Sequence, residues 1–149
     1  TDPVSLYLNS IQVTNSANSS GGTLYVWLTN TDFNNTASGL IADFGGTTQG
    51  SADFHFLYDT LNNEFGGGIF ASGNNATSST GGTSFSSSLA SPITPTPPYS
   101  LTIFAEITHT AAGQVSSFDA SITTVPVPAT AWLFGSALFG ISTIIKRQK

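Results

Sequence analysis

A two-residue alternation of apolar and polar side chains is the feature that most restricts how this chain can fold. It is longest over residues 99–109, where an apolar side chain recurs at every second position. This period is typical of a β-strand with one buried face and does not suit an amphipathic helix. The apolar positions are Tyr99, Leu101, Ile103, Ala105 and Ile107, and the polar ones are Ser100, Thr102, Glu106 and Thr108.

Shorter alternating segments predict four further strands. They cover residues 5–13, 23–29, 53–59 and 115–124. In the first of them the phase changes near Asn9-Ser10, which predicts a β-bulge. The second is apolar on both faces, so we expect a central strand whose Tyr25 and Trp27 are covered by another part of the chain. We expect the last segment to form an antiparallel hairpin with residues 99–109.

Clusters of turn-forming residues separate the alternating segments. Residues 30–39 have the polar composition of a loop, and four prolines within residues 92–98 predict extended polyproline II. No helical period precedes residue 129. About seven short strands therefore predict an all-β outer domain, a β-sandwich or jelly roll, over residues 1–124. The turn clusters are Ser19-Ser20-Gly21-Gly22, Gly45-Gly46, Gly66-Gly67-Gly68 and Gly81-Gly82.

The charge distribution excludes some classes of partner. No Lys or Arg occurs before residue 146, whereas all eight acidic residues do, so residues 1–145 carry a formal charge of −8. Such a domain repels phosphate backbones, and we expect no nucleic-acid partner. The chain also has no Cys, so disulfides cannot stabilise the fold.

An uncharged, mostly apolar run covers residues 129–145 and is followed by the basic tail 146–149. As a helix, the run would span roughly 25 Å, close to the ~30 Å hydrocarbon core of a bilayer. We therefore predict a single transmembrane helix with a cytoplasmic tail. This topology places the outer domain outside the inner membrane, which requires export. Because no signal peptide is visible at the N-terminus, we expect that one was removed. Trp132, Lys146, Arg147 and Lys149 are the predicted membrane-interface anchors.

Small residues within this run favour close packing of the predicted helix against another helix. They form two pairs with a spacing of four, Ala131 with Gly135 and Ser136 with Gly140. Such pairs allow helix backbones to approach closely in lipid. Other transmembrane subunits and copies of the same chain are both possible partners.

The C-terminal residues resemble the PEP-CTERM sorting signal of Gram-negative bacteria. The resemblance lies in the Pro-rich motif Val125-Pro126-Val127-Pro128, then Trp132-Leu133-Phe134-Gly135-Ser136, then the basic end. Val127 stands where the family has its central Glu. The resemblance implies secretion, processing by an exosortase near the Pro-x-Pro motif, frequent glycosylation and a link to exopolysaccharide or biofilm. It also implies that the catalytic residues belong to the exosortase.

A few polar residues are candidates for modification or for binding a metal ion. Asn18, Asn34 and Asn75 begin Asn-x-Ser/Thr triplets, the acceptor pattern for N-glycosylation. A Ca²⁺ site could use Asp32, Asp43, Asp53 and Asp59 with Asn34 and Asn35. A transition-metal site could join His55 and His109 to Asp53 or Glu106. Local packing is the alternative for the histidines, and we predict no cofactor.

The resulting functional hypothesis is a non-enzymatic protein of the cell surface or extracellular matrix that carries a sorting signal. We expect it in the inner membrane with its outer domain in the periplasm, or at the cell surface after sorting. The alternatives are an accessory single-span subunit of a larger inner-membrane complex and a self-assembling surface filament subunit. No Gly-x-Ser-x-Gly motif is present, and no carboxylate pair is marked out by the sequence.

Overall fold

A computed structural model of the chain describes residues 3–75 and 82–126. Within these ranges the secondary structure consists of strands and contains no helix, so none is long and apolar enough to cross a membrane. The apolar run 129–145 lies outside them. The strands are β1 (Ser5–Thr14), β2 (Gly22–Phe33), β3 (Gly39–Thr48), β4 (Ser51–Asp59), β5 (Gly68–Asn75), β6 (Thr83–Ser91), β7 (Tyr99–His109) and β8 (Val115–Val125).

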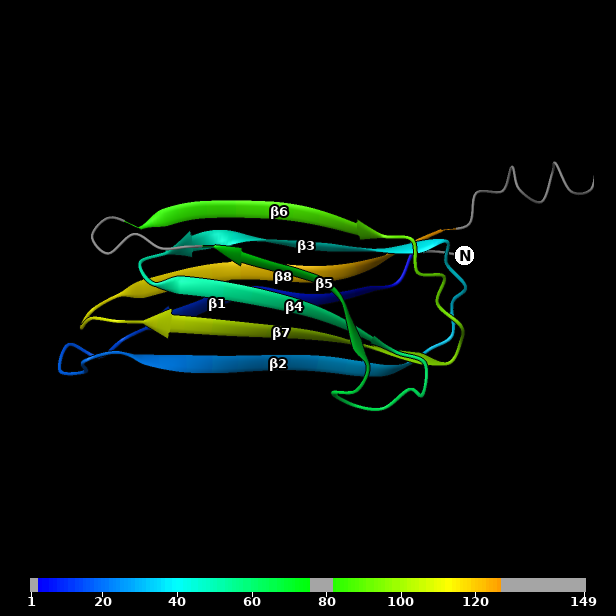
Figure 1. Cartoon of the computed structure of the whole chain (residues 1–149), viewed down its shortest axis with the longest axis horizontal. Helices are drawn as coiled ribbons and strands as arrows, with labels where there is room; N and C mark the ends of the chain where they lie inside the picture. Colours follow the sequence, from blue (N-terminus) through cyan, green and yellow to red (C-terminus); the bar gives the residue numbers. More distant parts are fainter. Residues whose placement is uncertain (1–2, 76–81, 127–149) are drawn as a thin grey trace, which may run out of the picture.

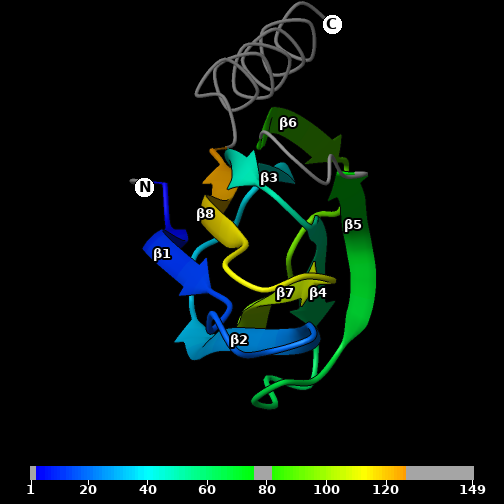
Figure 2. The same ribbon diagram turned by 90° about the vertical axis from the view of Figure 1, so that its left-hand side faces the viewer.

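Two four-stranded antiparallel sheets pack face to face (Figures 1 and 2). One has the order β1-β8-β3-β6 and the other the order β2-β7-β4-β5. Most successive strands therefore lie in opposite sheets, which is the arrangement of a jelly roll. The prediction of an all-β sandwich is confirmed.

The predicted hairpin between the last two strands is wrong. β7 lies between β2 and β4, whereas β8 lies between β1 and β3 in the other sheet. The connection that follows His109 crosses from one sheet to the other. Ile107 of β7 and Phe118 of β8 can therefore both point into the core from opposite sides.

The glycine pair Gly45-Gly46 does not form a turn, as its composition had suggested, but lies inside β3. These residues pair with Ser86 and Phe85 of β6 on one side and with β8 on the other. A Cβ atom on Gly46 would lie 2.1 Å from the carbonyl oxygen of Ser117. Glycine thus allows β8 to approach β3 closely at this point.

Other boundaries also differ from the predicted ones. β2 continues to Phe33, into the segment 30–39 that was expected to be a loop, and Val125 is the last residue of β8. β2 is an edge strand and not a central one. The predicted bulge near Asn9-Ser10 is confirmed: the register shifts between Leu8 and Ile11, and Ser10 has a φ of 55°.

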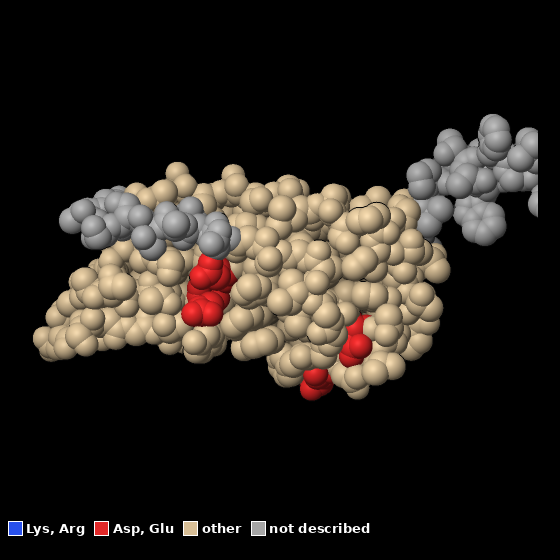
Figure 3. Space-filling model, in the orientation of Figure 1, with Lys and Arg blue, Asp and Glu red and all other residues tan. Residues whose placement is uncertain are grey.

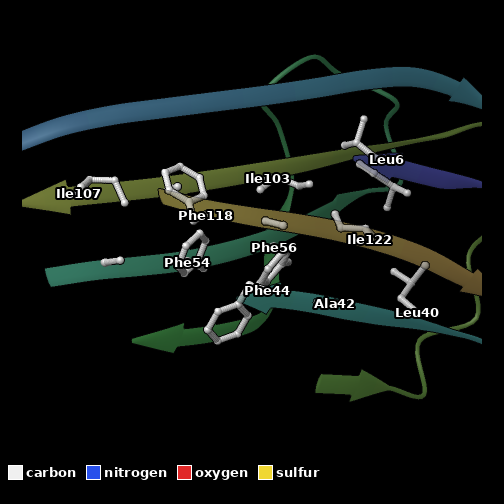
Figure 4. Packing of buried hydrophobic residues seen from close by; sticks show 14 of the residues in the cluster. Leu6, Leu40, Ala42, Phe44, Phe54, Phe56, Ile103, Ile107, Phe118 and Ile122 are labelled. Atoms are coloured by element: carbon white, nitrogen blue, oxygen red, sulfur yellow. The ribbon is translucent and has the colours of Figure 1, made fainter. Parts of the chain in front are cut away.

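Aromatic side chains from both sheets dominate the core between them (Figure 4). Phe44 of β3 stacks on Phe54 of β4 with ring centroids 4.8 Å apart, and Phe118 of β8 meets Phe54 edge-on at 5.3 Å. Burying one such side chain stabilises the fold by roughly 1.5–3 kcal/mol. The core therefore holds the sheets together without any disulfide.

Candidate functional site on the outer face of the β2-β7-β4-β5 sheet

Aromatic side chains gather on the outer face of the β2-β7-β4-β5 sheet, away from the core. Phe104 of β7 is in the centre, stacked on Trp27 of β2 at 4.1 Å and on His55 of β4 at 5.4 Å between ring centroids. Tyr25 stacks on the same ring at 5.9 Å. We call Tyr25, Trp27, His55, Phe65 and Phe104 the aromatic cluster. Tyr25 is 57% exposed and Trp27 46% exposed, so the expectation that another part of the chain covers them is wrong.

Strand register brings these residues together. Trp27 pairs with Phe104, which pairs in turn with His55, so three neighbouring strands contribute one ring each to a row. Two residues along each strand, about 7 Å away, Glu106 pairs with Tyr25 on one side and with Asp53 on the other. Because alternate residues face the same side of a sheet, the row of rings and the row of carboxylates share this outer face.

Phe65 joins the cluster from the β4–β5 loop, which folds over the same face. Its backbone N–H donates to Thr29 Oγ1 at 3.3 Å, and its ring meets Trp27 at 6.2 Å, nearly perpendicular. Ser100 Oγ donates to the carbonyl of Asn63 in this loop at 2.7 Å. These contacts place the Phe65 ring beside Trp27.

Asp59 organises the start of that loop. Its carboxylate accepts the backbone N–H groups of Leu61 at 3.0 Å and Asn63 at 3.1 Å, and the Asn63 side-chain amide at 2.9 Å. The bond from Leu61, together with those from Asn63, lowers the pKa of Asp59 against the opposing effect of its burial. The loop is therefore held by an ionised carboxylate at neutral pH.

Two shallow hollows open on this face. One, of about 330 Å³, is lined by Trp27 and Phe65 and is mostly apolar. The other, of about 300 Å³, is lined by Asp53, His55, Ser72 and Gly73 and is polar. They lie at opposite ends of the ring row, one beside Trp27 of β2 and the other beside His55 of β4. A ligand that follows the row therefore meets an apolar and a polar hollow.

This part of the surface is acidic and has no basic side chain. Figure 3 shows acidic side chains and no Lys or Arg on the face that it displays. All three basic residues of the chain lie at positions 146–149, outside the ranges that the structure describes. A ligand on the aromatic cluster thus meets carboxylates without any countercharge from residues 3–75 or 82–126.

The opposite outer face, on the β1-β8-β3-β6 sheet, has a groove of about 580 Å³. Tyr7 is the large apolar side chain exposed there, at 55%. Asp43 and Asp119 line the groove with serine hydroxyls, and Asp119 also accepts the backbone N–H of Ser10 at the bulge, at 2.6 Å. Of the two aromatic residues that line this groove, Tyr7 is exposed and Phe44 is buried in the core, so the groove presents no exposed row of rings.

The two histidines do not meet, so the proposed metal site that joined them is wrong. His55 lies on the outer face, whereas His109 points into the sandwich and its Nε2 lies 2.8 Å from Ser116 Oγ. Burial lowers the pKa of His109, which keeps its ring neutral at neutral pH. Across residues 3–75 and 82–126, no three or more His, Asp or Glu side chains are grouped so that they could hold a metal ion.

The four aspartates proposed for Ca²⁺ are dispersed, so that proposed site is also wrong. Asp32 accepts from the Asn62 side chain at 2.7 Å, and Asp59 caps its own loop. Asp43 lines the groove on one sheet, and Asp53 lines a hollow on the other.

The other predicted site residues fall partly within the described ranges. Asn18 and Asn34 are exposed, as glycan acceptors must be, and Asn75 ends β5. Val125 ends β8 and Pro126 is exposed. Outside the described residues lie the rest of the sorting motif, the helix-packing residues and the interface anchors: Val127, Pro128, Ala131, Gly135, Ser136, Gly140, Trp132, Lys146, Arg147 and Lys149.

Comparisons with known proteins leave the family open. No protein-family model and no curated protein matches the chain. Solved structures of infectious bursal disease virus are similar to it. The VP2 subviral particle is 15% identical with a TM-score of 0.46, and a Gx strain structure is 13% identical with a TM-score of 0.43. Each match covers 83% of this chain but only about a third of the viral chain, 33% and 32% respectively.

The sequence contained one signal for the aromatic cluster that strand prediction does not use. Phe104 interrupts the otherwise polar face of residues 99–109. An apolar ring on the solvent side of a half-buried strand becomes informative when other rings lie beside it and form a contiguous patch. Only the strand order places this ring between Trp27 and His55.

Proposed function

We propose that the chain is a non-enzymatic, exported protein of the cell surface or extracellular matrix, whose β-sandwich is displayed outside and whose C-terminal segment is a sorting signal. The sandwich ends where the PEP-CTERM-like motif begins. Val125 closes β8, and its carbonyl accepts the backbone N–H of Ser38 at 2.8 Å and the Ser38 hydroxyl at 3.2 Å. Pro126 follows as an exposed residue without strand structure.

This boundary is the observation that carries the proposal. A processing enzyme needs an extended, accessible segment outside the folded domain. Cleavage after Pro126 would remove the sorting segment and leave all eight strands with their hydrogen bonds. The N-terminal end of β1 lies at the same end of the sandwich (Figure 1), where Thr124 N–H donates to the carbonyl of Val4 at 2.9 Å.

The surface composition also supports the proposal. Only 7% of the residues are charged, and Ser, Thr, Asn and Gly take their place. The exposed Asn18 and Asn34 can accept glycans without disturbing the core. A hydroxyl-rich surface with few charged groups and no basic ones is compatible with a hydrated polysaccharide matrix.

The test is the intact mass of the protein isolated from its native cells. We expect a mass that ends within residues 125–128, increased by attached sugar. The variant Pro128→Ala should retain the full-length mass, whereas Pro92→Ala, which changes an exposed proline elsewhere, should be processed normally. A full-length mass for the unaltered protein, extracted only by detergent together with other subunits, would contradict the proposal.

A further inference from the structure

We propose that the aromatic cluster is a binding site for a neutral polysaccharide built of β-linked pyranose rings. The ligand would stack in the apolar hollow between Trp27 and Phe65 and extend across Phe104 toward His55. This inference goes beyond the sorting role, because its residues lie on β2, β4, β7 and the β4–β5 loop and none belongs to the C-terminal signal.

The site combines aromatic ring surface with polar groups, as the surface of a sugar does. A pyranose ring presents C–H groups on its faces and hydroxyl groups around its rim, so a site for it needs an aromatic wall with hydrogen-bonding groups beside it. Trp27 and Phe65, set at 84° to each other, provide such a wall. Glu106 and Asp53 supply acceptors in the neighbouring row.

A third row extends the polar side of the site. Thr23 and Thr108 lie on the same outer face, two residues beyond Tyr25 and Glu106, with their hydroxyl oxygens 2.8 Å apart. Both hydroxyls can donate to and accept from sugar hydroxyls. Along the strands the face therefore changes from aromatic rings to carboxylates and then to hydroxyls.

The size of the face fits several sugar rings and not one. The apolar hollow at β2 and the polar hollow at β4 are two strands apart, about 10 Å by the usual strand spacing. That distance exceeds a single sugar ring and suits a short stretch of an extended chain. The β4–β5 loop closes one end of the face through the bond from Ser100 to Asn63, so the chain is expected to run across the strands and not along them.

Charge selects the kind of ligand. Residues 3–75 and 82–126 contain acidic side chains and no Lys or Arg, so no ammonium or guanidinium group there can pair with a sulfate, phosphate or uronate group. A second copy of the domain would bring carboxylates against carboxylates. A protein partner with an apolar patch would have to bury Asp53 and Glu106 without countercharge, which interface cores avoid. A neutral, hydroxylated polymer meets none of these costs.

The experiment is titration calorimetry of the full-length chain with cellohexaose, in a detergent that has no sugar headgroup. We expect saturable binding of cellohexaose and none of β-1,4-linked hexaglucuronate, which has the same ring linkage but a carboxylate on each ring. Trp27→Ala should weaken binding at least about tenfold, a change of 1.4 kcal/mol. Tyr7→Ala is the matched control, because it removes a similarly exposed ring from the opposite sheet and should leave the affinity unchanged.

A second variant guards against a folding defect. Phe65→Ala removes a ring that is 53% exposed in a loop, and it should weaken binding without changing the circular dichroism spectrum. Absence of cellohexaose binding, equal affinity for the hexaglucuronate, or unchanged affinity in both ring variants would overturn the proposal. None of these results depends on how the C-terminus is processed, so the mass measurement above remains an independent test of sorting.

Discussion

Removing the hydroxyl of Ser116 should destabilise the sandwich, because this group connects a buried chain of hydrogen bonds between the two sheets. Ser116 Oγ of β8 lies 2.7 Å from Thr48 Oγ1 of β3 and 2.8 Å from His109 Nε2 of β7. Thr48 Oγ1 in turn accepts the backbone N–H of Gly50 at 3.0 Å. All three side chains are buried. One arrangement satisfies every group: Gly50 donates to Thr48, Thr48 to Ser116, and Ser116 to a neutral His109.

The loss of stability in Ser116→Ala can be estimated from this series of hydrogen bonds. In Ser116→Ala the Thr48 hydroxyl loses its acceptor and His109 Nε2 loses its donor. A buried polar group left without a partner costs about 1–3 kcal/mol. Two such groups, partly relieved by local adjustment, give an expected loss of about 2–4 kcal/mol in the free energy of unfolding. That is a large fraction of the roughly 5–15 kcal/mol typical of a domain.

Urea unfolding of the purified chain, followed by circular dichroism, measures this loss. The matched control is Ser117→Ala, the next residue of β8, which is exposed. Its unfolding free energy should stay within about 0.5 kcal/mol of the unaltered protein. If Ser116→Ala behaved like this control, the buried hydrogen bonds of Ser116 would contribute nothing to stability, which would refute the prediction. An unchanged urea slope is also required, since a changed slope would indicate a different unfolded state.

The remaining predictions concern single buried or capping groups and use the same urea assay. Tyr99 is fully buried and its hydroxyl has no hydrogen-bond partner among residues 3–75 and 82–126. Tyr99→Phe should therefore leave stability unchanged or raise it by about 1 kcal/mol, and a clear loss would contradict this. Burial, with a contribution from Tyr58, raises the pKa of Tyr99 above its usual 10.0, so stability should fall as the pH rises past 10, and less so in Tyr99→Phe. The bond from Leu61 lowers the pKa of Asp59 below 3.8, so stability from this carboxylate is present above that pH and lost as the pH falls further; Asp59→Asn should remove this acid dependence.

Alternation predicted the strands that have one clean buried face. β7 begins and ends at the predicted residues, and β8 differs from its predicted end by one residue. In such strands the period alone decides which side chains enter the core. Their pairing was predicted wrongly, because a short connection between two alternating segments suits a hairpin and a crossover between sheets equally well. The crossover is decided by the pairing of the other strands, since β7 pairs with β2 and β4 while β8 pairs with β1 and β3.

The strands β3, β5 and β6 escaped prediction because small residues obscure their period. β3 contains Gly45-Gly46, and β6 contains Ser86-Ser87-Ser88. In β5, Gly73 lies over the core ring of Phe44, whose Cζ would be 2.3 Å from an added Cβ. The glycines Gly46 and Gly73, which look like turn formers, lie inside strands where neighbouring elements leave no room for a Cβ atom. Such packing is a property of the assembled fold and has no local signal.

The carboxylates beside the aromatic cluster connect the fold to its proposed use. Asp53 and Glu106 are directly opposite on adjacent strands. Like charges in that position destabilise a sheet, whereas a favourable cross-strand pair stabilises it by roughly 0.2–1 kcal/mol. Within the described ranges no Lys or Arg relieves the repulsion. A pair of hydroxyl residues such as Thr23 and Thr108, one row away, would avoid the cost. A charged pair that weakens the sheet beside an exposed row of rings is therefore better explained by binding than by folding, and the acceptor oxygens that it offers are those that a sugar hydroxyl requires.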